Sequence, residues 1–240
     1  MTLLRRLGLP LAALLLAFGL IGLGVWQVQR LAWKQHLIAA VDSRKDAAPI
    51  SAAGPDQWAT LSPEQDVYRR VTATGVFRHD QSVLVQAVTE RGGGFWVMTP
   101  LDIGRYRIFI NRGFVPPEKA KPASRAEGDV TDTVTVTGLM RFSEPKGGFL
   151  RDNDPAADRW FSRDIAAMAK AKAVTHAAPY FIDADATPNA GGYPIGGMTV
   201  VTFTNNHLVY ALTWFGLAGI AFFFAWMLWR SPRRQDNVHK

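Results

Sequence analysis

Residues near the C-terminus place an imidazole, a phenol and an indole on one face of a predicted helix. His207, Tyr210, Ala211 and Trp214 follow the spacing i, i+3, i+4 and i+7, so their side chains share that face. Together these groups could hold a flat aromatic ligand. The same residue types also form the aromatic belt at membrane surfaces, with His207 as a polar residue at headgroup level. The pattern alone leaves both interpretations open.

The helix that positions these side chains is apolar and long enough to cross a membrane. Residues 209–229 form a run of 21 residues without a charge. At about 1.5 Å rise per residue this run spans roughly 31 Å, against about 30 Å for a hydrocarbon core. We therefore predict a transmembrane helix over residues 208–229, with Asn205 or Asn206 as its cap.

A second uncharged run, over residues 7–25, predicts another span near the N-terminus. No A-x-A-like cleavage site follows it, so we interpret residues 7–28 as an uncleaved anchor rather than a signal peptide. A stripe of Trp and Leu continues the helical pattern to about Lys45. Small residues would let the two spans pack closely: Ala13, Ala17, Ala221 and Ala225.

The positive charge of the chain lies beside the two predicted spans. The formal net charge is +7, but residues 31–206 carry 20 Lys/Arg against 19 Asp/Glu. This central region has no basic excess for phosphates, so we expect no nucleic-acid partner. The basic ends suit a lipid bilayer, and the positive-inside rule places residues 1–6 and 230–240 in the cytoplasm. We expect a bacterial inner-membrane protein whose residues 29–207 form a periplasmic domain; in an organelle the domain would face the intermembrane side.

The central region reads as one α+β domain with a mainly antiparallel β-sheet and a few helices. Short β-branched or aromatic segments between turn residues predict strands: residues 71–77, 83–88, 95–98, 106–111, 134–142 and 198–204. Ser162 or Asp164 can cap a short helix that ends near Lys172. Arg112 stands beside Gly113, where we expect a surface turn, although an anion could also bind there.

Common enzyme motifs are absent from the sequence: there is no G-x-S-x-G, H-E-x-x-H or G-x-x-x-x-G-K-[ST]. Residues 152–154 resemble the start of a calcium loop, but Ala157 and Arg163 stand where Gly and Glu are required. The chain has no Cys, which excludes disulfides and Cys-ligated metals. We predict that the chain is not an enzyme; the alternative is a membrane-anchored hydrolase built from scattered Ser, His and Asp.

Several short motifs bracket nearly the entire chain: GVWQ at 24–27 with Arg30, Trp33 and Lys34, YRRV at 68–71 with GVF at 75–77, GFWVMTPL at 94–101, NRGFVP at 111–116 and NNHLVYALTWF at 205–215. Their order and spacing resemble the Surfeit locus protein 1 family of cytochrome c oxidase assembly factors. One departure is Phe114, where the family usually has Trp.

The resemblance implies that the chain helps to place haem a into subunit I of a haem-copper oxidase, directly or indirectly from haem A synthase. It implies His207 as a haem ligand, and Tyr210 and Trp214 are neighbours that could stack on the macrocycle. We add Arg30 and Arg112 as candidate contacts of the haem propionates. The alternative is a scaffold that steadies subunit I without binding haem.

The sequence assigns no binding role to the other histidines of the central region. We expect His36, His79 and His176 at exposed or loop positions. The client implied by the resemblance is either a cytochrome c oxidase or a quinol oxidase.

Overall fold

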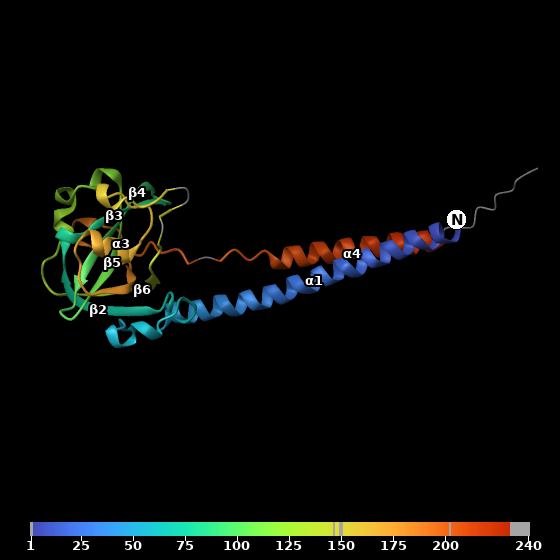
Figure 1. The fold of residues 1–240 in the computed structure, drawn as a ribbon, viewed down its shortest axis with the longest axis horizontal. Helices are drawn as coiled ribbons and strands as arrows, with labels where there is room; N and C mark the ends of the chain where they lie inside the picture. Colours follow the sequence, from blue (N-terminus) through green and yellow to red (C-terminus); the bar gives the residue numbers. More distant parts are fainter. Residues whose placement is uncertain (1, 146, 149–150, 202, 231–240) are drawn as a thin grey trace, which may run out of the picture. The chain divides into compact units, whose positions relative to one another are not determined.

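The computed structural model describes residues 2–145, 147–148, 151–201 and 203–230, and the chain forms two compact units (Figure 1). Residues 1–40 and 202–240 contribute to the first unit, which we call the helix pair. Residues 41–201 form the second unit, the β domain. Most of the tail predicted over residues 230–240 lies outside the described residues.

The helix pair consists of α1 (Thr2–Asp46) and α4 (His207–Arg230). Both helices contain a segment that is long and apolar enough to cross a membrane, as the sequence predicted. The 45 residues of α1 extend over roughly 68 Å, more than twice the thickness of a hydrocarbon core. The helix therefore continues well beyond a single crossing, and it ends close to Lys45, as expected.

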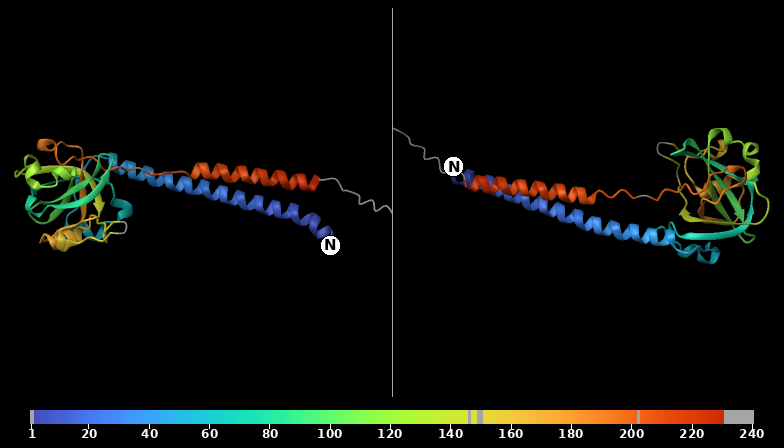
Figure 2. Two further views of the ribbon diagram at one scale, coloured as in Figure 1. Left: turned by 90° about the horizontal axis from the view of Figure 1, so that it is seen from above. Right: turned by 180° about the vertical axis from the view of Figure 1, so that it is seen from behind.

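Small side chains line the contact between the two helices, which run antiparallel and side by side (Figure 2). On α4 the buried residues are all alanines, at positions 211, 218, 221 and 225. On α1, Ala17 is fully buried, and Gly24 lies so close to Phe215 that a Cβ would stand 2.5 Å from its ring. The close packing predicted for Ala17, Ala221 and Ala225 is confirmed.

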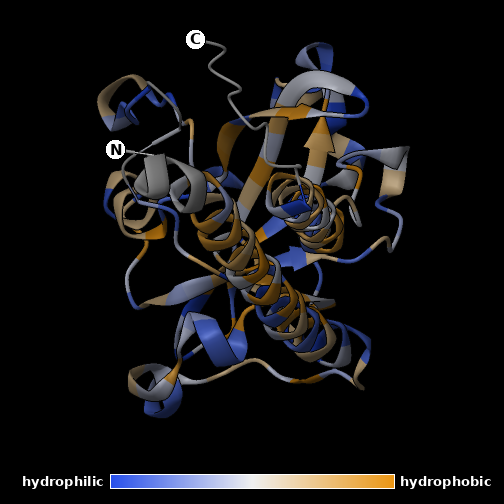
Figure 3. Ribbon diagram, turned by 90° about the vertical axis from the view of Figure 1, so that its right-hand side faces the viewer, coloured by the Kyte–Doolittle hydropathy of each residue, from blue (hydrophilic) through white to orange (hydrophobic). Residues whose placement is uncertain are grey.

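Large apolar side chains cover the faces of both helices that point away from the contact. The ribbons of the two helices are coloured as hydrophobic along much of their length (Figure 3). Phe223, Trp226 and Trp229 of α4 are about half exposed or more, as are Leu15 and Phe18 of α1. Water would penalise such an exposed apolar surface, whereas lipid chains would solvate it. The outer surface of the pair therefore suits a bilayer.

The β domain is built on a seven-stranded sheet in the order β1-β2-β6-β7-β5-β4-β3. Its strands are β1 (Ile50–Ser51), β2 (Arg70–Phe77), β3 (Val83–Thr89), β4 (Gly92–Asp102), β5 (Arg107–Val115), β6 (Val134–Phe142) and β7 (Ala177–Ala184). Neighbours are antiparallel except β1 with β2 and β5 with β7. The end of β4 also pairs with β2, so five strands close into a ring. The α+β class with a mainly antiparallel sheet is confirmed.

Short helices connect and cover the strands. The α-helices are α2 (Pro63–Asp66) and α3 (Ile165–Ala171). The 3₁₀ helices are η1 (Pro55–Thr60), η2 (His79–Gln81), η3 (Pro117–Lys119), η4 (Pro122–Gly128), η5 (Pro155–Ala157) and η6 (Ala190–Gly192). Asp164 caps α3, accepting a hydrogen bond from the Ala167 amide at 3.1 Å, which confirms one of the two predicted caps.

Alternating side chains of the central strands divide between two apolar cores. On β5, Ile108 and Ile110 join the core that includes Leu101 and Tyr180. Phe109, between them, joins the second core, where it packs with Trp160 and with residues of α3. This period of two is what a strand buried on both faces requires.

The strand expectations differ from the structure in three places. No strand was predicted at β7, although it is central and largely buried, because it begins Ala-Ala-Pro and shows little β propensity there. Conversely, the described residues of 198–204 form no strand. In addition, β5 continues through Arg112 and Gly113 to Val115, where a turn was expected.

We expect Gly113→Ala to destabilise the β domain by about 2 kcal/mol or more. Gly113 has a φ of +123°, and an added Cβ would overlap the carbonyl group of Ile195. Gly93→Ala in β4 is the matched control, because its Cβ would meet no atom within 4 Å. Thermal unfolding of the detergent-purified chain, followed by circular dichroism, measures both; equal stability of the two variants would contradict the prediction.

Candidate functional site

His207 lies in the first turn of α4, where it contacts α1. The first turn closes with a hydrogen bond from the Tyr210 amide to the Asn206 carbonyl oxygen, 3.2 Å. The imidazole is half-buried, and its Nδ1 lies 2.7 Å from Oε1 of Gln27 on α1. Within the described part of the chain, no polar group contacts Nε2. One ring nitrogen of His207 is therefore held by α1 and the other is available.

The aromatic neighbours of His207 do not all lie on the same side of α4. Ala211, one turn after His207, is buried against α1, and Trp214 is half-buried on the same stripe. Tyr210 is 55 % exposed, so its ring lies toward the outside of the pair. The structure thus brings His207 and Trp214 onto the seam between the helices and leaves Tyr210 beside it.

Further polar groups of the helix pair surround this end of α4. Lys34 Nζ donates a hydrogen bond to the Thr204 carbonyl oxygen, and Oδ1 of Asn205 is buried with no hydrogen-bond partner among the described residues. Arg30 is exposed and lies over the ring of Trp33, with its guanidinium carbon 4.6 Å from the ring centre. We call His207, Gln27, Arg30, Lys34 and Asn205 the polar mouth of the helix pair. An apolar span that ends in such a cluster offers an imidazole, with cationic groups on the next two turns of α1.

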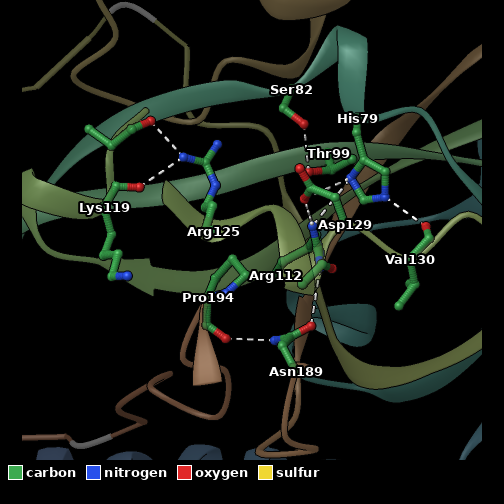
Figure 4. A network of polar contacts seen from close by, with 12 residues as sticks. His79, Ser82, Thr99, Arg112, Lys119, Arg125, Asp129, Val130, Asn189 and Pro194 are labelled. Atoms are coloured by element: carbon green, nitrogen blue, oxygen red, sulfur yellow. Dashed lines mark hydrogen bonds and ion pairs between the residues drawn. The ribbon is translucent and has the colours of Figure 1, made fainter. Parts of the chain in front are cut away.

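Arg112, the other candidate propionate contact, belongs to a network inside the β domain (Figure 4). Its side chain is 2 % exposed, so the expectation of a surface turn was wrong. Nη1 donates to Asp129 Oδ1 at 3.1 Å, and Nη2 donates to the Gly128 carbonyl and to Asn189 Oδ1. The guanidinium also lies over the ring of Phe77, 4.8 Å from its centre. These contacts give Arg112 a structural role, and a contact with a propionate stays a prediction.

Burial and the neighbouring carboxylate shift the pKa of Arg112 in opposite directions. Burial lowers the pKa of its guanidinium, and the Asp129 carboxylate beside it opposes that shift. Because the ordinary pKa of arginine is far above neutral, the side chain stays cationic. Asp129 is the counter-ion that makes burial of this cation tolerable, since an unpaired buried charge is strongly destabilising.

His79 takes part in the same network, from η2 after β2. Its Nδ1 lies 3.2 Å from Asp129 Oδ1, and its Nε2 lies 2.8 Å from the Val130 carbonyl oxygen. The side chain is 18 % exposed. His79 therefore lies in a 3₁₀ helix with its ring largely enclosed, and the expectation of an exposed or loop position was wrong for this residue. His36 and His176 are exposed, as expected.

A second charged cluster, around Asp183 of β7, was not found from the sequence. Asp183 is 2 % exposed and accepts hydrogen bonds from Asn111 Nδ2 at 2.8 Å, Arg141 Nη1 at 2.9 Å and Arg163 Nη1 at 3.3 Å. Glu144 also binds both arginines. Burial lowers the pKa of Arg163, but the carboxylates of Asp183 and Glu144 outweigh it and raise that pKa overall. The two arginines and two carboxylates therefore neutralise one another.

This cluster forms one wall of a cavity of about 580 Å³ in the β domain. Tyr68, Trp96 and Met198 supply apolar surface to the same cavity. Arg141 and Glu144 are three residues apart, but Arg163 and Asp183 lie about 20 residues or more from them and from each other. The strand that carries Asp183 was also not predicted, so no local pattern indicated the cluster. In the part of the chain that the structure describes, no three His, Cys, Asp or Glu residues group as a metal site.

Comparison with known proteins gives consistent matches over most of the chain. The model of the SURF1 family matches residues 14–219, a range that includes Gln27 and His207. Surfeit locus protein 1 of Mus musculus is 40 % identical over 215 residues, covering 82 % of this chain and 67 % of that protein. The Homo sapiens protein of the same name is 39 % identical over 217 residues (82 % and 69 %). The SURF1-like protein of Monosiga brevicollis is 39 % identical over 215 residues (83 % and 79 %).

We expect Arg112→Lys to lower the free energy of unfolding by roughly 3 kcal/mol, because an ammonium cannot reproduce the forked contacts of the buried guanidinium. Arg159→Lys is the control: Arg159 is 68 % exposed in its pair with Asp154, and the change should leave the stability unaltered. Chemical denaturation in detergent measures both. An Arg112→Lys protein of wild-type stability that binds less ligand would instead assign Arg112 to a binding site.

Proposed function

The chain belongs to the SURF1 family, and from this premise we propose that it is a membrane-anchored assembly factor for haem-copper cytochrome c oxidase. In this proposal it helps to place haem a into subunit I and receives the haem, directly or indirectly, from haem A synthase. The observation that carries the proposal is His207 in the polar mouth, half-buried at the start of an apolar helix, with one ring nitrogen held and the other available.

The residues of the polar mouth fit the chemistry of haem a as cargo. An imidazole is a common axial ligand of haem iron, and Trp214 and Tyr210 provide aromatic surface within two turns. Arg30 lies one turn from Gln27 and exposes a guanidinium that could bind propionates. The buried Oδ1 of Asn205 is a further polar atom there that has no hydrogen-bond partner in the described part of the chain. A farnesylated, apolar cofactor also suits a site at membrane level.

The membrane arrangement is part of the same proposal. The helices α1 and α4 cross the bilayer, and both termini lie in the cytoplasm. The β domain lies on the opposite side of the membrane. In a bacterium this is the inner membrane with a periplasmic domain. The basic residues at both ends of the chain support this orientation, because positively charged loops stay on the cytoplasmic side.

The proposal assigns no reaction to the chain. In the β domain, Arg112 pairs with Asp129, and Arg141 and Arg163 pair with Asp183 and Glu144, which supports a structural role for these three arginines. The role is therefore one of binding and presentation: His207 holds the iron, the aromatic rings contact the macrocycle, and the apolar helices keep the cargo out of water.

The test is the visible absorption spectrum of the detergent-purified chain, produced together with the haem A pathway. We expect a haem a spectrum in the wild type and, in His207→Ala, haem binding about tenfold weaker or more, equivalent to about 1.4 kcal/mol. His36→Ala is the matched control, because His36 is an exposed histidine of α1 in the same unit. It should leave the spectrum unchanged.

The other outcomes separate the alternatives. A colourless wild-type protein that co-purifies with oxidase subunit I would replace haem binding by the scaffold role. Equal haem spectra in wild type and His207→Ala would move the site away from His207. Turnover of an added ester or amide would contradict the non-enzymatic role.

A further inference from the structure

The hydrogen bond between Gln27 and His207 joins the two helices of the pair at the polar mouth. Gln27 is half-buried on α1, and its Oε1 lies 2.7 Å from His207 Nδ1 on α4, 180 residues away in sequence. At 2.7 Å this contact is at the short end of the range for such bonds. Gln29, two residues further along α1, is exposed. The contact with α4 is therefore specific to Gln27 and is not shared by the nearby glutamine.

The chemistry of the two groups fixes the direction of the bond. A carboxamide oxygen accepts hydrogen bonds and cannot donate, so the proton of the bond must belong to Nδ1 of the imidazole. A neutral imidazole carries only one N–H, and a proton on Nδ1 leaves the lone pair on Nε2. The bond therefore selects one of the two tautomers and one orientation of the ring.

Metal-binding histidines commonly have this arrangement. The ring nitrogen that does not bind the metal donates its N–H to a carbonyl or carboxylate, which fixes the tautomer and makes the other nitrogen more basic. Removing such a partner typically weakens metal binding by roughly 10- to 100-fold. The half-buried contact between two apolar helices strengthens the effect, because a hydrogen bond is stronger where water is excluded.

We propose that Gln27 is a positioning residue for His207: its carboxamide oxygen accepts the Nδ1 proton, so that Nε2 is presented to the haem iron. This inference rests on the proposed function in one respect, the identity of the group that Nε2 binds. The tautomer itself is a property of the haem-free protein.

The packing of the pair supports the assignment. Gly24, one turn before Gln27, has no Cβ and lies against Phe215, which brings the helices close at this level. Ala211, one turn after His207, is buried on the same seam. Gln27 can therefore reach across the seam without an intervening side chain.

The first experiment measures the tautomer without haem. The full-length chain labelled with ¹⁵N-histidine, purified in detergent without haem, should show Nδ1 of His207 as the protonated nitrogen and Nε2 as the unprotonated one, with His207→Ala assigning the signals. In Gln27→Met, which keeps the length of the side chain but loses the acceptor, the signal should shift toward the Nε2–H form. Gln29→Met is the matched control and should change nothing.

The second experiment measures haem binding to the same variants. We expect Gln27→Met to bind haem a roughly 10- to 100-fold more weakly than wild type. Gln27→Glu retains an acceptor, so it should keep most of the affinity and lower the midpoint potential of the bound haem, because a carboxylate makes the imidazole a stronger donor to iron.

The outcomes separate this inference from the proposed function. An Nε2–H tautomer in the wild type, or wild-type haem affinity in Gln27→Met, would overturn the positioning role. The predicted tautomer, lost in Gln27→Met, together with no haem uptake by the wild type would support the role of Gln27 in orienting His207 and reject haem as the cargo.

Discussion

The close approach of α1 and α4 is the constraint on which the candidate site depends. Lipid chains are as apolar as the helix surfaces, so association within a bilayer relies on packing and on interhelical hydrogen bonds instead of the hydrophobic effect. Alanines on α4, with Ala17 and Gly24 on α1, remove the side chains that would keep the backbones apart. Only then can an amide on one helix reach the imidazole on the other. The hydrogen bond at the polar mouth therefore depends on the small residues that let the two helices pack closely.

In the β domain, the main constraint is that arginine side chains are buried or largely enclosed within a closed sheet. Arg112 is held by Asp129 and by carbonyl oxygens, and Arg163 shares Asp183 and Glu144 with Arg141. Each guanidinium therefore has an acidic partner, which limits the cost of removing it from water. Such pairs favour a single arrangement of strands, because β6 and β7 must be in register for Arg141 to meet Asp183.

Sequence patterns predicted those elements whose signal is local. The apolar runs predicted both long helices, Asp164 predicted the start of α3, and residues 134–142 predicted β6 with its observed bounds. The elements and contacts that the sequence did not predict depend on partners that are distant in sequence. β7 has weak local propensity and is stabilised by β5 and β6 on its two sides, whereas the described residues of 198–204 have suitable side chains but pair with no strand. In the same way, Gln27 was visible as a polar residue after an apolar run, but its contact with His207 required the antiparallel packing of the pair.

The bond between Gln27 and His207 has a consequence for the release of a bound group. If Nε2 binds a ligand more tightly while Nδ1–H is held by α1, thermodynamic reciprocity requires that the ligand also holds the two helices together more tightly. A protein that inserts between the helices and breaks the bond would then lower the affinity of His207 for its ligand by the same factor. Unloading could thus be driven by the free energy with which that protein binds between the helices, with no chemical change in the ligand.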